Sequence, residues 1–213
     1  MKFKLILLAL SMMLFNCKKK QEQLNFKYAN LNAEINCGNS YDALLNEALH
    51  AFESDLTNFY TPNNTNLNSA YRRFVNESTR NTANLNGIAN QHSIDIFNTL
   101  KDVDGLWDAK NNKMNYSHEI FSCIGNNINA VDIKTTYNAL ISTNSMSLRM
   151  FEAPLKKYSR ILQTEKYLAT FVALDLYYSK LTNVDLTKKD ELKKEQNTIA
   201  NPEKDPHAGH NHD

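Results

Sequence analysis

Apolar residues recur every three or four positions through most of the chain between residues 41 and 181. The spacing is clearest from Tyr41 to Tyr60, where the apolar positions fall within one arc about 140° wide when the chain is drawn as a helix. A stripe of this kind is typical of an amphipathic helix with one face against a core. We therefore expect a first helix over 41–60, with Ser40 as its N-cap and Pro62 just beyond its end.

The same periodicity predicts further helices, at about 67–80, 85–103, 117–123, 132–143, from 146 onward, and 158–181. Asp132 is the expected N-cap of the fourth of these. The last is apolar almost all round, so we expect it to be the central helix. Residues 106–115 break the pattern and are expected to form a loop. The five glycines and four prolines are too few for a turn-rich all-β fold. The prediction is an all-α bundle of five to seven helices.

The first residues of the chain follow a different pattern. A charge-free apolar run, Leu5–Phe15, stands behind Lys2 and Lys4. A transmembrane helix needs about 20 apolar residues, so this shorter run has the length of a signal-peptide core. It ends at Leu14-Phe15-Asn16-Cys17, and polar sequence begins at Lys18.

This segment resembles the signal peptide of bacterial lipoprotein precursors, in which cleavage occurs just before a cysteine whose thiol is then lipidated. Leu14 and Cys17 match the family's lipobox, whereas Phe15 and Asn16 depart from it, because smaller residues are usual there. The alternative is an ordinary secretory signal, but no small-x-small cleavage site precedes Cys17. The resemblance covers residues 1–17 alone. It implies removal of residues 1–16 and attachment of lipid, including fatty acids such as palmitate, to Cys17.

The resemblance also implies a location. Acyl chains on Cys17 would hold the protein at a membrane, since each buried methylene adds about 0.8 kcal/mol. In lipoproteins of bacteria with two membranes, an aspartate after the cysteine favours the inner membrane, and Lys18 stands at that position. We therefore expect a protein of the bacterial cell envelope, anchored in the outer membrane and facing the periplasm.

The chain divides by composition into four parts: the signal peptide 1–16, the lipidated cysteine and flexible tether 17–37, a helical domain 38–184, and a charged tail 185–213 that is expected to be disordered. Loss of Lys2 and Lys4 with the signal peptide lowers the 24 basic side chains to 22, against 23 acidic ones. A protein so close to neutral lacks the basic surplus that nucleic-acid binding requires, so nucleic acid is not expected as a partner.

Three cysteines are present, and lipidation of Cys17 would leave Cys37 and Cys123 as an even pair. In an oxidising compartment such a pair is a candidate disulfide. It would close a loop of more than about 80 residues, which the chain-entropy model values at about 4 kcal/mol. The alternative is two separate thiols.

Three histidines lie in the last seven residues of the tail, namely His207, His210 and His212, with Asp205 and Asp213 beside them. Three imidazoles and a carboxylate suit a divalent transition metal such as zinc or copper. Without a packed shell to orient the rings, affinity would be moderate and selectivity poor. The alternative is a solvated tail with no metal role.

Outside the tail, the sequence contains no recognisable catalytic or cofactor-binding motif. Glu47-x-x-His50 resembles half of a ferritin-like di-iron motif, but on the helical projection both side chains lie more than about 100° from the centre of the apolar arc, so they are expected to point outward. No Cys-x-x-Cys-His haem motif, Gly-x-Ser-x-Gly elbow or His-Glu-x-x-His zinc motif occurs.

The sequence therefore predicts a membrane-anchored lipoprotein that acts as a non-catalytic binding or accessory module, with metal-ion handling by the tail as one form of that role. A structural or protein-interaction lipoprotein with an envelope partner and an inert tail is the alternative. An enzyme with an unrecognised site is the third reading.

Overall fold

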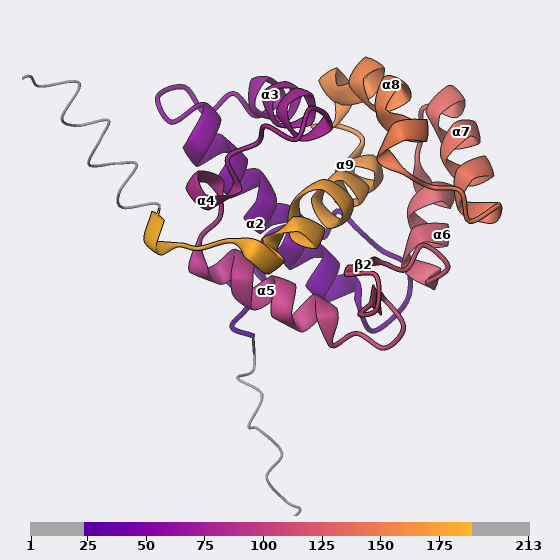
Figure 1. Ribbon diagram of the computed structural model, residues 1–213, viewed down its shortest axis with the longest axis horizontal. Helices are drawn as coiled ribbons and strands as arrows, with labels where there is room; N and C mark the ends of the chain where they lie inside the picture. Colours follow the sequence, from indigo (N-terminus) through magenta and orange to yellow (C-terminus); the bar gives the residue numbers. More distant parts are fainter. Residues whose placement is uncertain (1–23, 189–213) are drawn as a thin grey trace, which may run out of the picture.

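The computed structural model of the chain describes residues 24–188. Within this range eight α-helices account for most of the fold: α2 Asp42–Tyr60, α3 Leu67–Thr79, α4 Leu85–Ile88, α5 Gln91–Lys101, α6 Glu119–Asn127, α7 Val131–Ser142, α8 Leu148–Tyr158 and α9 Lys166–Val172. The predicted all-α helical bundle is confirmed. Helix α2 crosses the middle of the molecule, with α3 along one side, α5 along the other and α9 lying across it (Figure 1).

The predicted helix over 85–103 is divided in two. Ala89 and Asn90 adopt extended backbone angles, and the Asn90 side chain accepts a hydrogen bond from the Ser93 N–H at 3.2 Å, which caps the new helix α5. Asparagine side chains compete with the helix for backbone hydrogen bonds in this way. Because of this split, the described chain has eight α-helices, one more than the upper end of the expected five to seven.

The predicted loop over 106–115 contains a short antiparallel hairpin. Its strands are β1 Trp107–Asp108 and β2 Lys113–Met114, and Trp107 pairs with Met114. Trp107 also packs edge-on against Phe97 of α5, with ring centroids 5.5 Å apart. The tryptophan thus fixes the hairpin to the bundle, as large aromatic side chains do when their rings are covered.

The expected single helix over 158–181 is wrong as to continuity. The segment consists of the 3₁₀ turn η2 Ser159–Ile161, α9, the π-helical turn η3 Ala173–Tyr177 and the 3₁₀ turns η4 Tyr178–Asn183. Successive residues of a regular α-helix point about 100° apart. The wider π turn lets two neighbouring tyrosines both reach α2: Tyr177 donates to Asp55 at 2.6 Å and Tyr178 to the Ala48 carbonyl at 2.9 Å. The segment is deeply buried, as its composition predicted.

Two predicted helix caps are wrong. Helix α2 begins without a side-chain cap from Ser40. Instead, the Asp42 carboxylate in its first turn accepts hydrogen bonds from the Cys37 and Gly38 N–H groups at 2.8 and 2.9 Å. Helix α7 begins at Val131, so Asp132 lies inside its first turn, where a negative charge is favoured by the helix dipole.

Residues 24–37, here called the N-terminal arm, lie against α2 and α9. Asn46 of α2 forms hydrogen bonds to the arm backbone from both ends of its amide: Oδ1 accepts from the Glu34 and Ile35 N–H groups at 2.6 and 3.0 Å, and Nδ2 donates to the Ile35 carbonyl at 2.7 Å. Tyr167 of α9 is hydrogen-bonded to Asn36. Side chains thus satisfy arm backbone groups that would otherwise need a strand partner.

The arm ends at a covalent link. Cys37 and Cys123 form a disulfide, with Cα atoms 5.8 Å apart, so the predicted pairing is present in the structure. It connects the residues just before α2 to α6, the helix that follows the hairpin in the sequence. The start of α2 and helix α6 are therefore linked twice, by the backbone between them and by the disulfide.

Candidate ligand-binding groove

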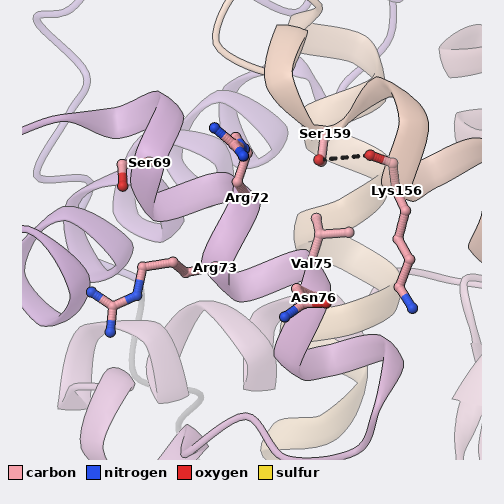
Figure 2. Close-up of a pocket in the computed structure, with 7 residues that line it drawn as sticks. All are labelled: Ser69, Arg72, Arg73, Val75, Asn76, Lys156 and Ser159. Carbon is pink, nitrogen blue, oxygen red and sulfur yellow. Dashed lines mark hydrogen bonds between the residues drawn. The ribbon is translucent and has the colours of Figure 1, made fainter.

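A groove of about 460 Å³ lies between α3 and the end of α8 with η2 (Figure 2). One wall is formed by residues of α3, namely Ser69, Arg72, Arg73, Val75 and Asn76. The other wall is formed by Lys156 and Ser159. The polar residues of α3 in this set stand at positions i, i+3, i+4 and i+7, so they share one face of the helix. The wall formed by α3 is therefore almost entirely polar, with Val75 buried at its base.

The charge of the groove comes from three cations. Lys156 forms an ion pair with Glu152 of its own helix. Arg73 donates to the Tyr60 carbonyl at 3.0 Å and lies over the Tyr60 ring, 5.0 Å from its centroid. For Arg72, by contrast, the structure between residues 24 and 188 shows neither an ion pair nor a hydrogen bond to the side chain, which is exposed.

The wall beside Arg73 is itself held in place. The Tyr60 hydroxyl donates to Glu77 at 2.6 Å. Burial, and then the bond to this carboxylate, raise the pKa of Tyr60 well above its ordinary value, so the phenol stays protonated. Across the groove, the Ser159 hydroxyl donates to the Lys156 carbonyl at 2.8 Å (Figure 2). The groove thus offers guanidinium, ammonium, hydroxyl and amide groups, and none of its lining side chains is a carboxylate.

A second candidate site is the buried pair of His92 and Glu47. His92 Nε2 lies 2.6 Å from Glu47 Oε1, and the same carboxylate accepts from the Lys27 and Tyr28 N–H groups of the arm at 2.6 and 2.9 Å. The expectation that Glu47 points outward is therefore wrong. It does face away from the apolar arc of α2, but the arm and α5 cover that side as well.

Glu53, three residues after His50 on the same helix, is largely covered too. Its carboxylate accepts from Tyr71 at 2.8 Å and pairs with Lys166 at 2.7 Å. His50 lies 3.2 Å from the Asn32 carbonyl of the arm. The residues of the Glu-x-x-His motif are thus engaged with different parts of the chain and do not converge on one point.

Asp55 is the centre of a third polar cluster. Its carboxylate accepts hydrogen bonds from Asn90, from the Ser93 hydroxyl and, at 2.6 Å, from Tyr177. Burial, and then the charge of Asp55, raise the pKa of Tyr177 well above its usual value, so the hydroxyl remains a donor. The cluster joins α2, α5 and the π turn. A buried carboxylate that accepts several hydrogen bonds acts here as a connection between elements.

The sequence-predicted sites are only partly within the described range. Cys17, His207, His210, His212, Asp205 and Asp213 all lie outside it. Among residues 24–188, no group of three or more histidine, cysteine or acidic side chains is placed to hold a metal ion. The same residues include no helix both long and apolar enough to cross a membrane.

The groove was not predicted from the sequence, although its α3 wall could have been. Positions 69, 72, 73 and 76 are polar with helical spacing, opposite the apolar positions Tyr71, Phe74 and Val75 that predicted the inner face. A polar stripe on a helix is usually its solvent face, so the stripe alone does not indicate a groove. The second wall comes from residues 80 or more positions away, and no local pattern connects them.

Comparison with protein-family models, with curated proteins and with solved structures finds no match to this chain.

Proposed function

We propose that this chain is a lipid-anchored protein of the bacterial cell envelope whose helical domain is a non-catalytic binding module. The observation that supports this most is the docked N-terminal arm. A lipid on Cys17 would be attached seven residues before Leu24, a stretch of chain that spans at most about 25 Å. Asn46 and Glu47 hold the arm to α2. A lipid anchor just before the arm would therefore orient the whole helical domain at the membrane.

The arrangement of the elements supports the binding role. The first described residues lie along one edge of the molecule beside α5, whereas α3 and α8 lie along the opposite edge (Figure 1). A domain anchored through the arm would therefore turn the α3–α8 groove away from the membrane. The buried histidine and carboxylates described above are already engaged in hydrogen bonds that connect elements of the fold, which favours a structural role for them.

The anchor is tested by replacing Cys17. In a bacterial host, the unaltered chain should take up a clickable fatty acid and stay with the membrane fraction after a high-salt wash. The C17S variant should take up no label and should leave the washed membranes. The Cys123→Ser variant is the matched control and should keep the label. Labelling of C17S equal to that of the unaltered chain would contradict the proposal.

Metal capture by the tail is a second candidate function, favoured by the spacing of His207, His210 and His212 between Asp205 and Asp213. Calorimetric titration with zinc and with copper should show a site in the full chain that is lost when the chain ends at residue 204. Equal binding by both chains would exclude the tail as the metal site.

A further inference from the structure

We infer that the α3–α8 groove binds a small soluble molecule through a phosphate group. The inference extends the proposed binding role and does not depend on the lipid anchor. It begins with the donors in the groove. Arg72, Arg73 and Lys156 carry only N–H donors, and a hydroxyl and an amide are added by Ser69 and Asn76. A site rich in donors and without a carboxylate matches a ligand rich in acceptors, and a phosphate group is such a ligand.

The distribution of charge supports an anionic ligand. Helix α3, helix α8 and η2 together carry six basic and two acidic side chains, a formal charge of +4, in a chain whose total is only +1. The rest of the sequence is therefore net negative. Three of the six basic residues, Arg72, Arg73 and Lys156, line the groove itself. Basic charge at a concave surface raises the local concentration of anions and speeds their association.

Arg72 has the properties of the main contact. Its guanidinium is not engaged by any carboxylate of the described chain, so a ligand would not have to displace an internal partner. A planar guanidinium can donate two parallel hydrogen bonds to a phosphate, which a lysine cannot reproduce. Asn76 stands four residues further along the same face of α3 and Ser69 three residues before, so both flank the same ligand position.

Arg73 is suited to be a second, already positioned donor to the ligand. It is held by the Tyr60 carbonyl and by the Tyr60 ring, which leaves it oriented before any ligand arrives. A donor that is already positioned loses less conformational entropy on binding. With Lys156 partly neutralised by Glu152, the two arginines supply most of the attraction.

The volume and openness of the site limit the ligand. A space of about 460 Å³ lies within the range of small-molecule sites. Val75 is its one apolar lining residue, so little hydrophobic surface is available to hold the remainder of the molecule. The ligand is therefore expected to be small and polar, with the phosphate as its principal point of contact.

The test is a titration of the full chain, kept in a non-ionic detergent, with inorganic pyrophosphate. Binding is monitored through backbone amide chemical shifts in NMR spectra. The shifts should move at Ser69, Arg72, Asn76 and Ser159. Loss of a charge-assisted bidentate contact in Arg72→Gln should weaken binding by about tenfold or more. The matched control is Arg80→Gln, which removes an exposed arginine at the end of α3 that does not line the groove and should change affinity by less than about twofold.

Arg72→Lys separates geometry from charge, and it should recover only part of the lost affinity. Three results would overturn the inference: no shifts at the groove residues, an equal effect of R72Q and R80Q, or tighter R72Q-sensitive binding of polyglutamate than of pyrophosphate. Vesicles of phosphatidylglycerol distinguish the source of the phosphate. R72Q-sensitive binding to vesicles without binding of pyrophosphate would contradict a soluble ligand. Because every outcome is judged by its sensitivity to Arg72→Gln and none depends on Cys17, failure here leaves the proposed anchor unaffected.

Discussion

Ser78 has a hydroxyl group for which the described chain provides no hydrogen bond. It lies buried in α3, beside a small pocket whose other lining residues include Ala83, Leu85 and Leu176. Buried polar side chains elsewhere in the described chain are hydrogen-bonded, such as Ser93 of α5, whose hydroxyl donates to Asp55. A buried polar group without a partner loses its bonds to water and receives nothing in return.

Replacement of Ser78 by alanine should therefore stabilise the protein, by about 1 kcal/mol, since it removes the unpaired hydroxyl and adds a better helix former. Urea unfolding measures the change. The control is Ser93→Ala, which should destabilise by about 1–3 kcal/mol because Asp55 loses a donor. Similar losses in both variants would show that the Ser78 hydroxyl has a partner after all.

Asp175 illustrates a second effect at this scale, a buried carboxyl group. Asp175 lies in the π turn and accepts a hydrogen bond from Tyr116, which precedes α6. Burial raises the pKa of Asp175 above its usual value, against the opposing effects of the Tyr116 bond and of Lys180. A raised folded-state pKa contributes stability at pH below the unfolded value, about 3.9, and that contribution is lost as the pH rises through the folded value.

The Asp175→Asn variant cannot ionise but can still accept from Tyr116. Its stability relative to the unaltered chain should therefore increase between about pH 3.5 and pH 7 in urea unfolding curves. Asp185→Asn should show the opposite trend, because the bond from the Thr187 hydroxyl lowers the pKa of exposed Asp185. A difference independent of pH for Asp175→Asn would mean that Asp175 does not titrate abnormally.

At the scale of elements, the N-terminal arm shows how an extended segment is fixed without a sheet. Its backbone groups are bonded to side chains of α2 rather than to another strand: Asn46 holds Glu34 and Ile35, and Glu47 holds Lys27 and Tyr28. Ile35 adds a fully covered apolar anchor. The arm in turn covers a face of α2 that its apolar periodicity would leave in solvent.

Loss of the Asn46 amide should release the arm. The Asn46→Ala variant is expected to be less stable by about 1–3 kcal/mol, since three hydrogen bonds to arm backbone groups disappear together. Amide exchange within residues 24–36 should increase much more than exchange in α3. Asn58→Ala, on the exposed side of α2, is the matched control and should change neither quantity. Unchanged exchange in the arm of Asn46→Ala would show that other contacts hold it.

At the scale of the molecule, the Cys37–Cys123 disulfide joins segments 86 residues apart in sequence. It encloses α2, α3, α4, α5 and the hairpin in one covalent loop. Such a link restricts the unfolded chain far more than it changes the folded one. The fold therefore depends on an oxidising environment for part of its stability.

A variant with serine at both positions should lose about 4 kcal/mol of unfolding free energy, measured by denaturant titration. Addition of a reducing agent should destabilise the unaltered chain by a similar amount and leave the double variant unchanged, which is the control. If the reducing agent has no effect on a chain with a verified disulfide, the loop-entropy account is wrong.

The fold class and the places of the first two helices are determined by the sequence alone, because apolar residues at helical spacing are buried when helices pack together. The helices over 42–60 and 67–79 match their predicted ranges almost to the residue. Counting made Cys37 and Cys123 a candidate pair on the hypothesis that Cys17 carries lipid, but it left two separate thiols open, and the structure shows the disulfide. Local side-chain chemistry was harder, since Asn90 broke a helix that its apolar pattern extended.

Only the tertiary structure decided what lies on the polar faces. On periodicity alone, Glu47 and Arg72 are equivalent, because each is a charged residue away from an apolar arc. The arm and α5 cover Glu47 and hold it in hydrogen bonds. Beside Arg72, by contrast, α8 and η2 form the other wall of a groove, and no residue of the described chain forms an ion pair or hydrogen bond with its side chain. Periodicity reports the angle of a side chain around its own helix. Which segment of the chain lies opposite depends on contacts between residues distant in sequence, and those arise only when the chain folds.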